Sequence, residues 1–184
     1  MTEDNYVEES LLKDRKIFIS NDIDANIGAD VVQKLHYLAK DSSEPVTVFI
    51  FSDGGDLEAA MAIVDTMLAM RSKITIKTVA YKAASAAAYI LAMGTPGERY
   101  VFNNSIIMLH KTSLELPYDD EDKQKLYIEF SKNQTAKIYE LIAKSCGKKK
   151  ETFINDISKD LWLDAKSAKK YKIIDNIIKD ITEI

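Results

Sequence analysis

The chain has 184 residues, of which 46% are hydrophobic, so it can bury a core of useful size, and we expect one domain. Its single cysteine, Cys146, excludes an internal disulfide, and its two histidines are too few for an ordinary structural zinc site. A formal net charge of −4 argues against general nucleic-acid binding, which usually requires a basic surface.

Targeting and membrane signals are weak throughout the sequence. No N-terminal stretch combines basic residues with an apolar run, and no segment is long and apolar enough to cross a membrane. With the low cysteine content, this pattern predicts a reducing, cytoplasmic location, no membrane contact and metal-free chemistry.

The first half of the chain predicts alternating strands and helices, with order beginning near Leu11 after an acidic, polar start. In chain order we expect a strand over 15–20, a helix over 27–39, a strand over 46–51, a helix over 56–70, a strand over 74–80 and a helix over 85–93. The run 46–51 is too continuously apolar for a surface strand and indicates a buried parallel one. The alternation is typical of an α/β layered fold.

The second half predicts a protruding element. In chain order we expect short strands over 99–102 and 105–109, an irregular acidic segment over 111–122, a helix over 123–144, a solvated turn at 148–150, a helix capped by Asp164 through Tyr171 and a strand at Ile173 and Ile174. The long helix has apolar anchors but a mostly polar middle. We therefore expect it to project as an arm whose apolar stripe another subunit covers.

Ser85 is a lone hydroxyl among small residues, at the point where a β-branched strand gives way to an apolar helix. A serine at such a junction can project its oxygen from a rigid scaffold, beside the free N–H groups of the helix N-terminus. The alternative is that Ser85 only caps the helix.

Two other features could complete a nucleophilic site. His110 closes an apolar strand and could act as a general base, or be a hydrogen-bonded structural residue, whereas His36 lies inside an amphipathic helix and is expected to be structural or solvated. Gly54 and Gly55 can present backbone N–H groups to an oxyanion without a Cβ in the way. Spacing leaves the orienting acid open among Asp156, Asp160, Asp164 and Asp175.

Six stretches of sequence carry a resemblance to a known family. They are residues 10–19 (SLLKDRKIFI), 52–55 (SDGG), 63–67 (IVDTM), 83–85 (AAS), 104–110 (NSIIMLH) and 159–175, which begins KDLWLDA and ends YKIID. In this order and spacing they resemble the ClpP-type serine peptidases, the proteolytic subunits of the caseinolytic protease family, over nearly the whole chain.

The resemblance implies a role for each site residue. Ser85 would be the nucleophile, His110 the general base and Asp160 the orienting acid, with the backbone N–H groups of Gly55 and Ala86 as oxyanion donors. It also implies one domain over residues 1–184 with the α/β spiral of repeated ββα units that ClpP shares with crotonases, and a projecting handle over about residues 111–146.

The resemblance further implies a homo-oligomer of heptameric rings that stack into a tetradecamer around an inner chamber. There the chain would act as a serine endopeptidase on unfolded polypeptides, fed by an AAA+ unfoldase. The unfoldase would use the ATP, and this chain would need no cofactor.

The sequence departs from the family pattern at several places. Asp53 stands where the family usually has proline, Tyr81-Lys82 where it has Gly-Gln, and Ala86-Ala87 where it has Met-Gly. Residues 111–118 replace Gln-Pro and a glycine-rich strand that pairs with substrate and with the opposite ring, and the N-terminus before Leu11 is short. These departures leave open a non-catalytic or regulatory ring subunit. A crotonase-like acyl-CoA enzyme stays open as well, because that related spiral α/β fold also uses a strand-to-helix oxyanion hole.

Overall fold

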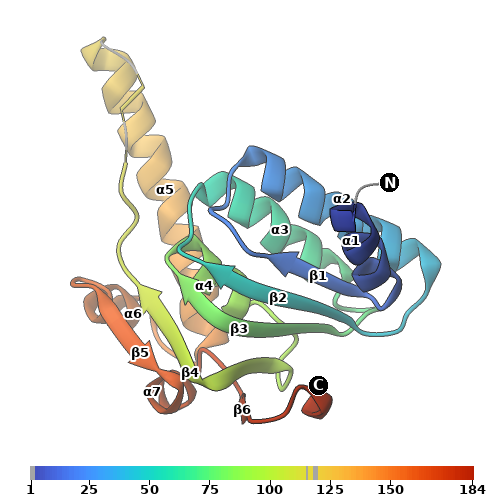
Figure 1. Cartoon of the computed structure of the whole chain (residues 1–184). Helices are drawn as coiled ribbons and strands as arrows, with labels where there is room; N and C mark the ends of the chain where they lie inside the picture. The colour runs from blue at the N-terminus through green and yellow to red at the C-terminus, as the bar shows by residue number, and fades with distance from the viewer. Residues whose placement is uncertain (1–2, 115, 118–119) are drawn as a thin grey trace.

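The computed structural model describes residues 3–114, 116–117 and 120–184, and its strands form one mostly parallel sheet (Figure 1). The strands run in the order β1-β2-β3-β4-β5, with β6 paired to β4. Their bounds are β1 (Lys16–Ile19), β2 (Val46–Ser52), β3 (Ile76–Ala84), β4 (Arg99–Leu109), β5 (Leu161–Asp164) and β6 (Asn176–Ile178). Strands β1 to β4 pair in parallel and β5 returns antiparallel to β4, which confirms the predicted α/β class.

The helices lie mainly on one side of this sheet (Figure 1). They are α1 (Glu3–Lys13), α2 (Ala25–Asp41), α3 (Leu57–Met70), α4 (Ala86–Ala92), α5 (Glu121–Ser145), α6 (Lys150–Asp156), α7 (Ala165–Tyr171) and the 3₁₀ helix η1 (Ile181–Glu183). Val48 and Ile50 of β2 are fully buried in one core cluster that also contains apolar side chains of α2 and α3. Within the described residues, no helix has the length and apolar character needed to span a bilayer.

The predicted arm corresponds to α5, which extends well beyond the rest of the molecule (Figure 1). Its outer part exposes Leu126 and Phe130, whereas Tyr139 and Ile142 near its C-terminal end are buried in the core. The predicted irregular segment before it has no regular structure over 111–114, while residues 115 and 118–119 lie outside the described part of the chain.

The N-terminal prediction is wrong, because α1 begins at Glu3 rather than near Leu11. Its sequence is polar, and the helix is held by tertiary contacts. Leu12 packs against the core, and Glu8 forms an ion pair with Lys34 of α2. Helix α2 itself matches the prediction and starts at a side-chain cap, where Asp24 accepts a hydrogen bond from the N–H of Ile27 at 2.8 Å.

The two strands predicted over 99–109 are one strand, β4. It pairs with β3 at Val101 opposite Ala80 and again at Ile106 opposite Lys82, so four residues of β4 face the single residue Tyr81. The hydroxyl of Ser105 stabilises this bulge in β4. It donates to the carbonyl of Ala80 at 2.7 Å and accepts from the N–H of Phe102 at 2.9 Å.

The C-terminal third also differs from the prediction. Helix α6 begins at Lys150, where a solvated turn was expected, and β5 was not predicted as a strand. The last strand is β6, not Ile173 and Ile174. Lys172 adopts a left-handed conformation that ends α7, and the two isoleucines after it are buried in the core. The predicted cap of α7 is confirmed, since Asp164 accepts from the N–H of Ser167 at 2.8 Å.

Candidate active site

Ser85 lies at the junction between β3 and α4, with backbone angles of φ 53° and ψ −124°. This is a strained conformation for a residue with a Cβ, and such strain is typical of functional turns. Ser85 occupies the cap position of α4, but its side chain makes no capping hydrogen bond. Its N–H donates to the carbonyl of Met108 at 2.9 Å, so the turn is fixed to β4.

The Ser85 hydroxyl contacts the imidazole of His110, with 2.7 Å between Oγ and Nε2. The contact follows from sheet pairing, because Ala84 at the end of β3 lies opposite Met108 near the end of β4. Both chains leave the sheet at the same edge, and both side chains are half-buried. The distance is within range for proton transfer between a serine and a general base.

Gly54, the first residue of the glycine pair, lies directly against this turn, and Gly55 lies against Ile23. A Cβ on Gly54 would come within 2.7 Å of the carbonyl oxygen of Ala84 and 2.8 Å of the Ser85 Cβ, and both Gly54 and Gly55 have positive φ angles, of 104° and 136°. Only glycine fits so close an approach.

The backbone around the glycine pair leaves two donors available. The Gly54 carbonyl accepts from the N–H of Ile23 at 2.7 Å, and the Ile23 carbonyl accepts from the N–H of Asp56 at 2.6 Å. Within the described residues, the N–H groups of Gly55 and Ala86 donate no hydrogen bond. Both N–H groups are thus free to donate, and their role as oxyanion donors stays a prediction.

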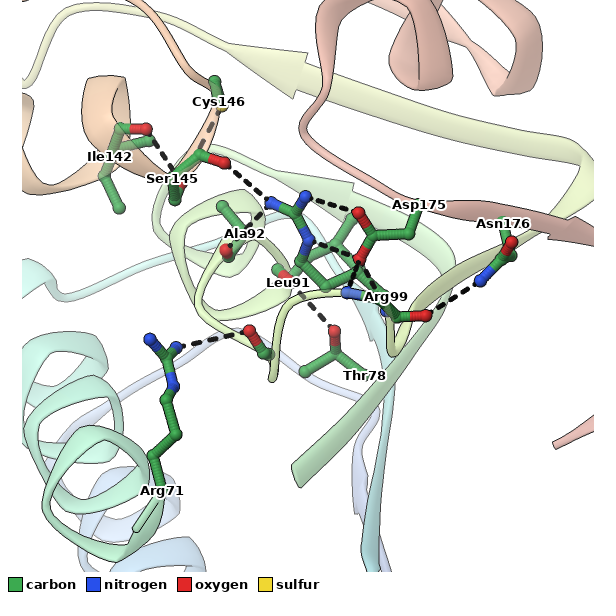
Figure 2. A network of polar contacts seen from close by, with 12 residues as sticks. Arg71, Thr78, Leu91, Ala92, Arg99, Ile142, Ser145, Cys146, Asp175 and Asn176 are labelled. Carbon is green, nitrogen blue, oxygen red and sulfur yellow. Dashed lines mark hydrogen bonds and ion pairs between the residues drawn. The ribbon is translucent and has the colours of Figure 1, made fainter. Parts of the chain in front are cut away.

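Three of the four candidate acids are engaged elsewhere. Asp164 caps α7, and Asp156 accepts from the hydroxyl of Tyr171 at 3.0 Å and pairs with a lysine. Asp175 binds the guanidinium of Arg99 through both carboxylate oxygens, at 2.7 and 2.8 Å (Figure 2). Burial alone would raise the pKa of the Asp175 carboxyl, but the hydrogen bonds and charge of Arg99 hold it below its usual value.

Asp160 remains, and it directly precedes β5, the strand that pairs antiparallel with the end of β4. The pairs between β4 and β5 end with Leu109 opposite Leu161, so the next pair in this antiparallel register is His110 and Asp160. Side chains of directly opposed residues lie on the same face, with Cβ atoms about 5 Å apart. Asp160 is exposed, and no hydrogen bond joins it to His110 among the described residues. Its role as the orienting acid stays a prediction.

Two tyrosines hold the chain around the imidazole and were not identified from the sequence. Tyr89 of α4 is buried, and its hydroxyl reaches the carbonyl of His110 at 3.5 Å. Tyr139 of α5 accepts a hydrogen bond from the N–H of Thr112 at 2.9 Å. Burial raises the pKa of Tyr89 well above its ordinary value, so it stays a neutral donor. Neither residue shows a sequence signal that distinguishes it from core packing.

Two of the departures from the family pattern contact each other. The ammonium of Lys82 lies 2.5 Å from the carboxylate of Asp53, an ion pair that joins the glycine loop to the strand carrying Ser85. Because Lys82 is opposite Phe51 at a bulge in β3, this pairing depends on local register that the sequence does not reveal.

Comparison with known proteins gives a consistent result. Residues 2–181 match the family model described as Clp protease. The chain is 32% identical over 172 residues to the ATP-dependent Clp protease proteolytic subunit 1 of Streptomyces coelicolor, covering 94% of this chain and 78% of the relative. It is 35% identical over 170 residues to proteolytic subunit 2 of Frankia casuarinae, covering 92% and 77%. It is 33% identical over 173 residues to proteolytic subunit 3 of Streptomyces avermitilis, covering 94% and 78%. The chain therefore belongs to the Clp protease family.

Proposed function

We propose that this chain is a serine endopeptidase subunit that hydrolyses unfolded polypeptides. The observation that carries the proposal is the 2.7 Å contact between Ser85 Oγ and His110 Nε2, on a strained turn next to two unused backbone donors. Membership of the Clp protease family supports peptidase chemistry and gives no support to the acyl-CoA alternative.

The proposed reaction follows from this geometry. His110 Nε2 takes the hydroxyl proton while Ser85 Oγ attacks the scissile carbonyl carbon. The carbonyl oxygen becomes an anion and accepts hydrogen bonds from the N–H groups of Gly55 and Ala86. The protonated imidazole then gives its proton to the leaving amine, and the C–N bond breaks to leave an acyl-enzyme. Water then attacks the acyl carbon while His110 takes its proton, the bond to Ser85 Oγ breaks, and the imidazolium returns the proton to Oγ as the acid product leaves. No step needs a cofactor or a metal ion.

Asp160 has a defined task in this scheme. For Nε2 to accept the proton, Nδ1 must carry the other ring hydrogen, and a carboxylate bonded to Nδ1 holds that tautomer. Asp160 can supply it by a rotamer change, because its carboxylate is exposed and has no hydrogen bond or ion pair within the described part of the chain.

The proposed assembly is a ring of identical subunits, heptameric by resemblance and stacked in pairs through α5, working in the cytoplasm with an AAA+ unfoldase. The relatives' names describe ATP-dependent proteases, which supports an ATP-driven partner. The exposed apolar side chains on the projecting α5 support its burial by another subunit.

A non-catalytic ring subunit is the second candidate. It is favoured by the missing hydrogen bond between Asp160 and His110 and by the altered sequence over 111–118. The two candidates differ in one respect that can be measured, namely whether Ser85 is nucleophilic.

The test is reaction of the purified protein with a serine-directed fluorophosphonate, read by intact mass, with native mass spectrometry for subunit number. We expect one label per subunit, lost in Ser85→Ala and slowed by about 10³-fold or more in His110→Ala. The matched control is Ser72→Ala, an exposed serine away from the site, which should label like the parent. A ring that takes no label and cleaves no unfolded polypeptide would instead establish the non-catalytic subunit.

A further inference from the structure

A hollow of about 840 Å³ lies away from the candidate active site, where the C-terminal ends of α3, α4, α5 and α7 meet. Its wall includes the apolar side chains of Leu68, Leu141 and Ile174. This volume is in the range of small-molecule sites, and its mixture of apolar wall and polar groups is typical of them.

Arg71 neutralises one of the helix ends around this hollow. Helix C-termini carry partial negative charge and unpaired carbonyl groups. The Arg71 guanidinium, at the end of α3, donates to the carbonyls of Met93 and Gly94 at 2.6 and 3.2 Å. The end of α4 therefore already has its cation.

Arg99 binds the Asp175 carboxylate and carbonyl groups at the ends of α4 and α5. It is 6% exposed, and it donates to the carbonyls of Ala92 and Ser145 at 3.3 and 3.1 Å while binding Asp175 (Figure 2). Asp175 contributes the only carboxylate among the residues lining the hollow, and both of its oxygens are used. The two arginines thus match Asp175 and the carbonyl groups at the ends of α4 and α5.

Three further cations line the same hollow without a counter-ion. Lys144, Lys169 and Lys172 form no ion pair and donate no side-chain hydrogen bond within the described residues. Five cationic side chains therefore face one carboxylate, an excess of four positive charges in a chain whose net charge is −4. Burial, and to a smaller extent the nearby charge of Arg99, lowers the pKa of Arg71.

We propose that this hollow binds a small anion with two or more phosphate groups. Arginine and lysine donors bind phosphate oxygens through charge-assisted hydrogen bonds, and several phosphates are needed to match several unpaired cations. The concave shape and the acidic surface of the whole chain favour a small ligand over a nucleic acid. The site is independent of Ser85, so it does not rest on the proposed peptidase function.

The test is calorimetric titration of the purified oligomer at low salt with tripolyphosphate and, separately, with ATP. The first probe offers phosphates alone, and the second adds a group for the apolar wall, so their relative affinities distinguish an inorganic from an organic ligand. Sulfate is the control for unspecific attraction. We expect saturable binding of at least one phosphate probe, weakened by about 100-fold in Lys144→Glu/Lys169→Glu, about tenfold for each charged contact.

The matched control is Lys40→Glu/Lys132→Glu, which makes the same charge change at exposed lysines outside the hollow, one of them also in the last turn of a helix. It should change affinity by less than about threefold. Lys144→Gln/Lys169→Gln provides a milder version should the charge reversal impair assembly. Failure of both probes to saturate, sulfate binding equal to theirs, or equal losses in the test and control variants would overturn the proposal.

Discussion

The conformation of Ser85 leads to a prediction that separates the strain of the turn from its chemistry. At φ 53° and ψ −124° a residue with a Cβ is held in a sparsely populated region, at a cost of about 1–3 kcal/mol. Glycine adopts such angles freely, although it loses about 0.4–1 kcal/mol more in chain entropy than alanine. Both Ser85→Gly and Ser85→Ala remove the hydroxyl. We therefore expect the glycine variant to be the more stable one, by about 1 kcal/mol.

Urea unfolding of both variants at one protomer concentration would measure this difference, since the stability of an oligomer depends on concentration. A difference of about 1 kcal/mol corresponds to roughly 2–4 °C in melting temperature for a chain of this size. Neither variant should cleave an unfolded polypeptide. If the alanine variant were equally stable or more stable, the turn would not be strained in the way that its angles indicate.

Three further predictions concern the surroundings of the site and the hollow. Lys82→Met or Asp53→Asn should reduce peptide turnover by about tenfold, but should lower the free energy of unfolding by only about 0.2–1 kcal/mol. The exchanged pair Asp53→Lys/Lys82→Asp should recover turnover. Unchanged turnover in the single variants would show that this ion pair does not position the glycine loop. Gly54→Ala should abolish fluorophosphonate labelling, because its Cβ would lie 2.7 Å from a backbone oxygen of the nucleophile turn, and labelling at the parental rate would contradict this. Arg99→Met should destabilise the fold by about 3 kcal/mol or more near neutral pH. Because Arg99 holds the pKa of Asp175 below its ordinary 3.8, this contribution is present above that value and is lost as pH falls through the lowered pKa. The unfolding free energies of parent and variant should therefore differ most near neutral pH and converge as the pH falls below about 3.8.

The parts of the fold that follow from local patterns were predictable. Strand β2 is recognisable from its continuous apolar run, although only the face toward the helices is fully buried and Phe51 on the other face is 57% exposed. The starts of α2 and α7 are marked by side-chain caps at Asp24 and Asp164. The proximity of Ser85 and His110 was predictable in outline, since each ends a strand and parallel strands end at one edge of a sheet.

The features that depend on tertiary contacts were not predictable from pattern alone. Helix α1 is too polar to be recognised by periodicity and relies on contacts made by Leu12 and Glu8. The β-branched pair Ile173 and Ile174 imitates a strand because burial, rather than pairing, selects those residues. Asp160 comes to the end of β4 only through the antiparallel return of β5, which follows the whole of α5 and α6. Local spacing holds no information about that return.

The bulge in β4 makes the candidate site sensitive to the number of residues in a segment that contains no reacting atom. Ser105 fixes four residues of β4 against the single residue Tyr81, and the strand then continues in register to His110. A deletion or insertion of one residue within 102–105 would shift the remainder of the strand by one position and bring Lys111 or Leu109 to the place of the imidazole. The number of residues in this bulge, more than their identity, therefore decides whether His110 lies beside Ser85.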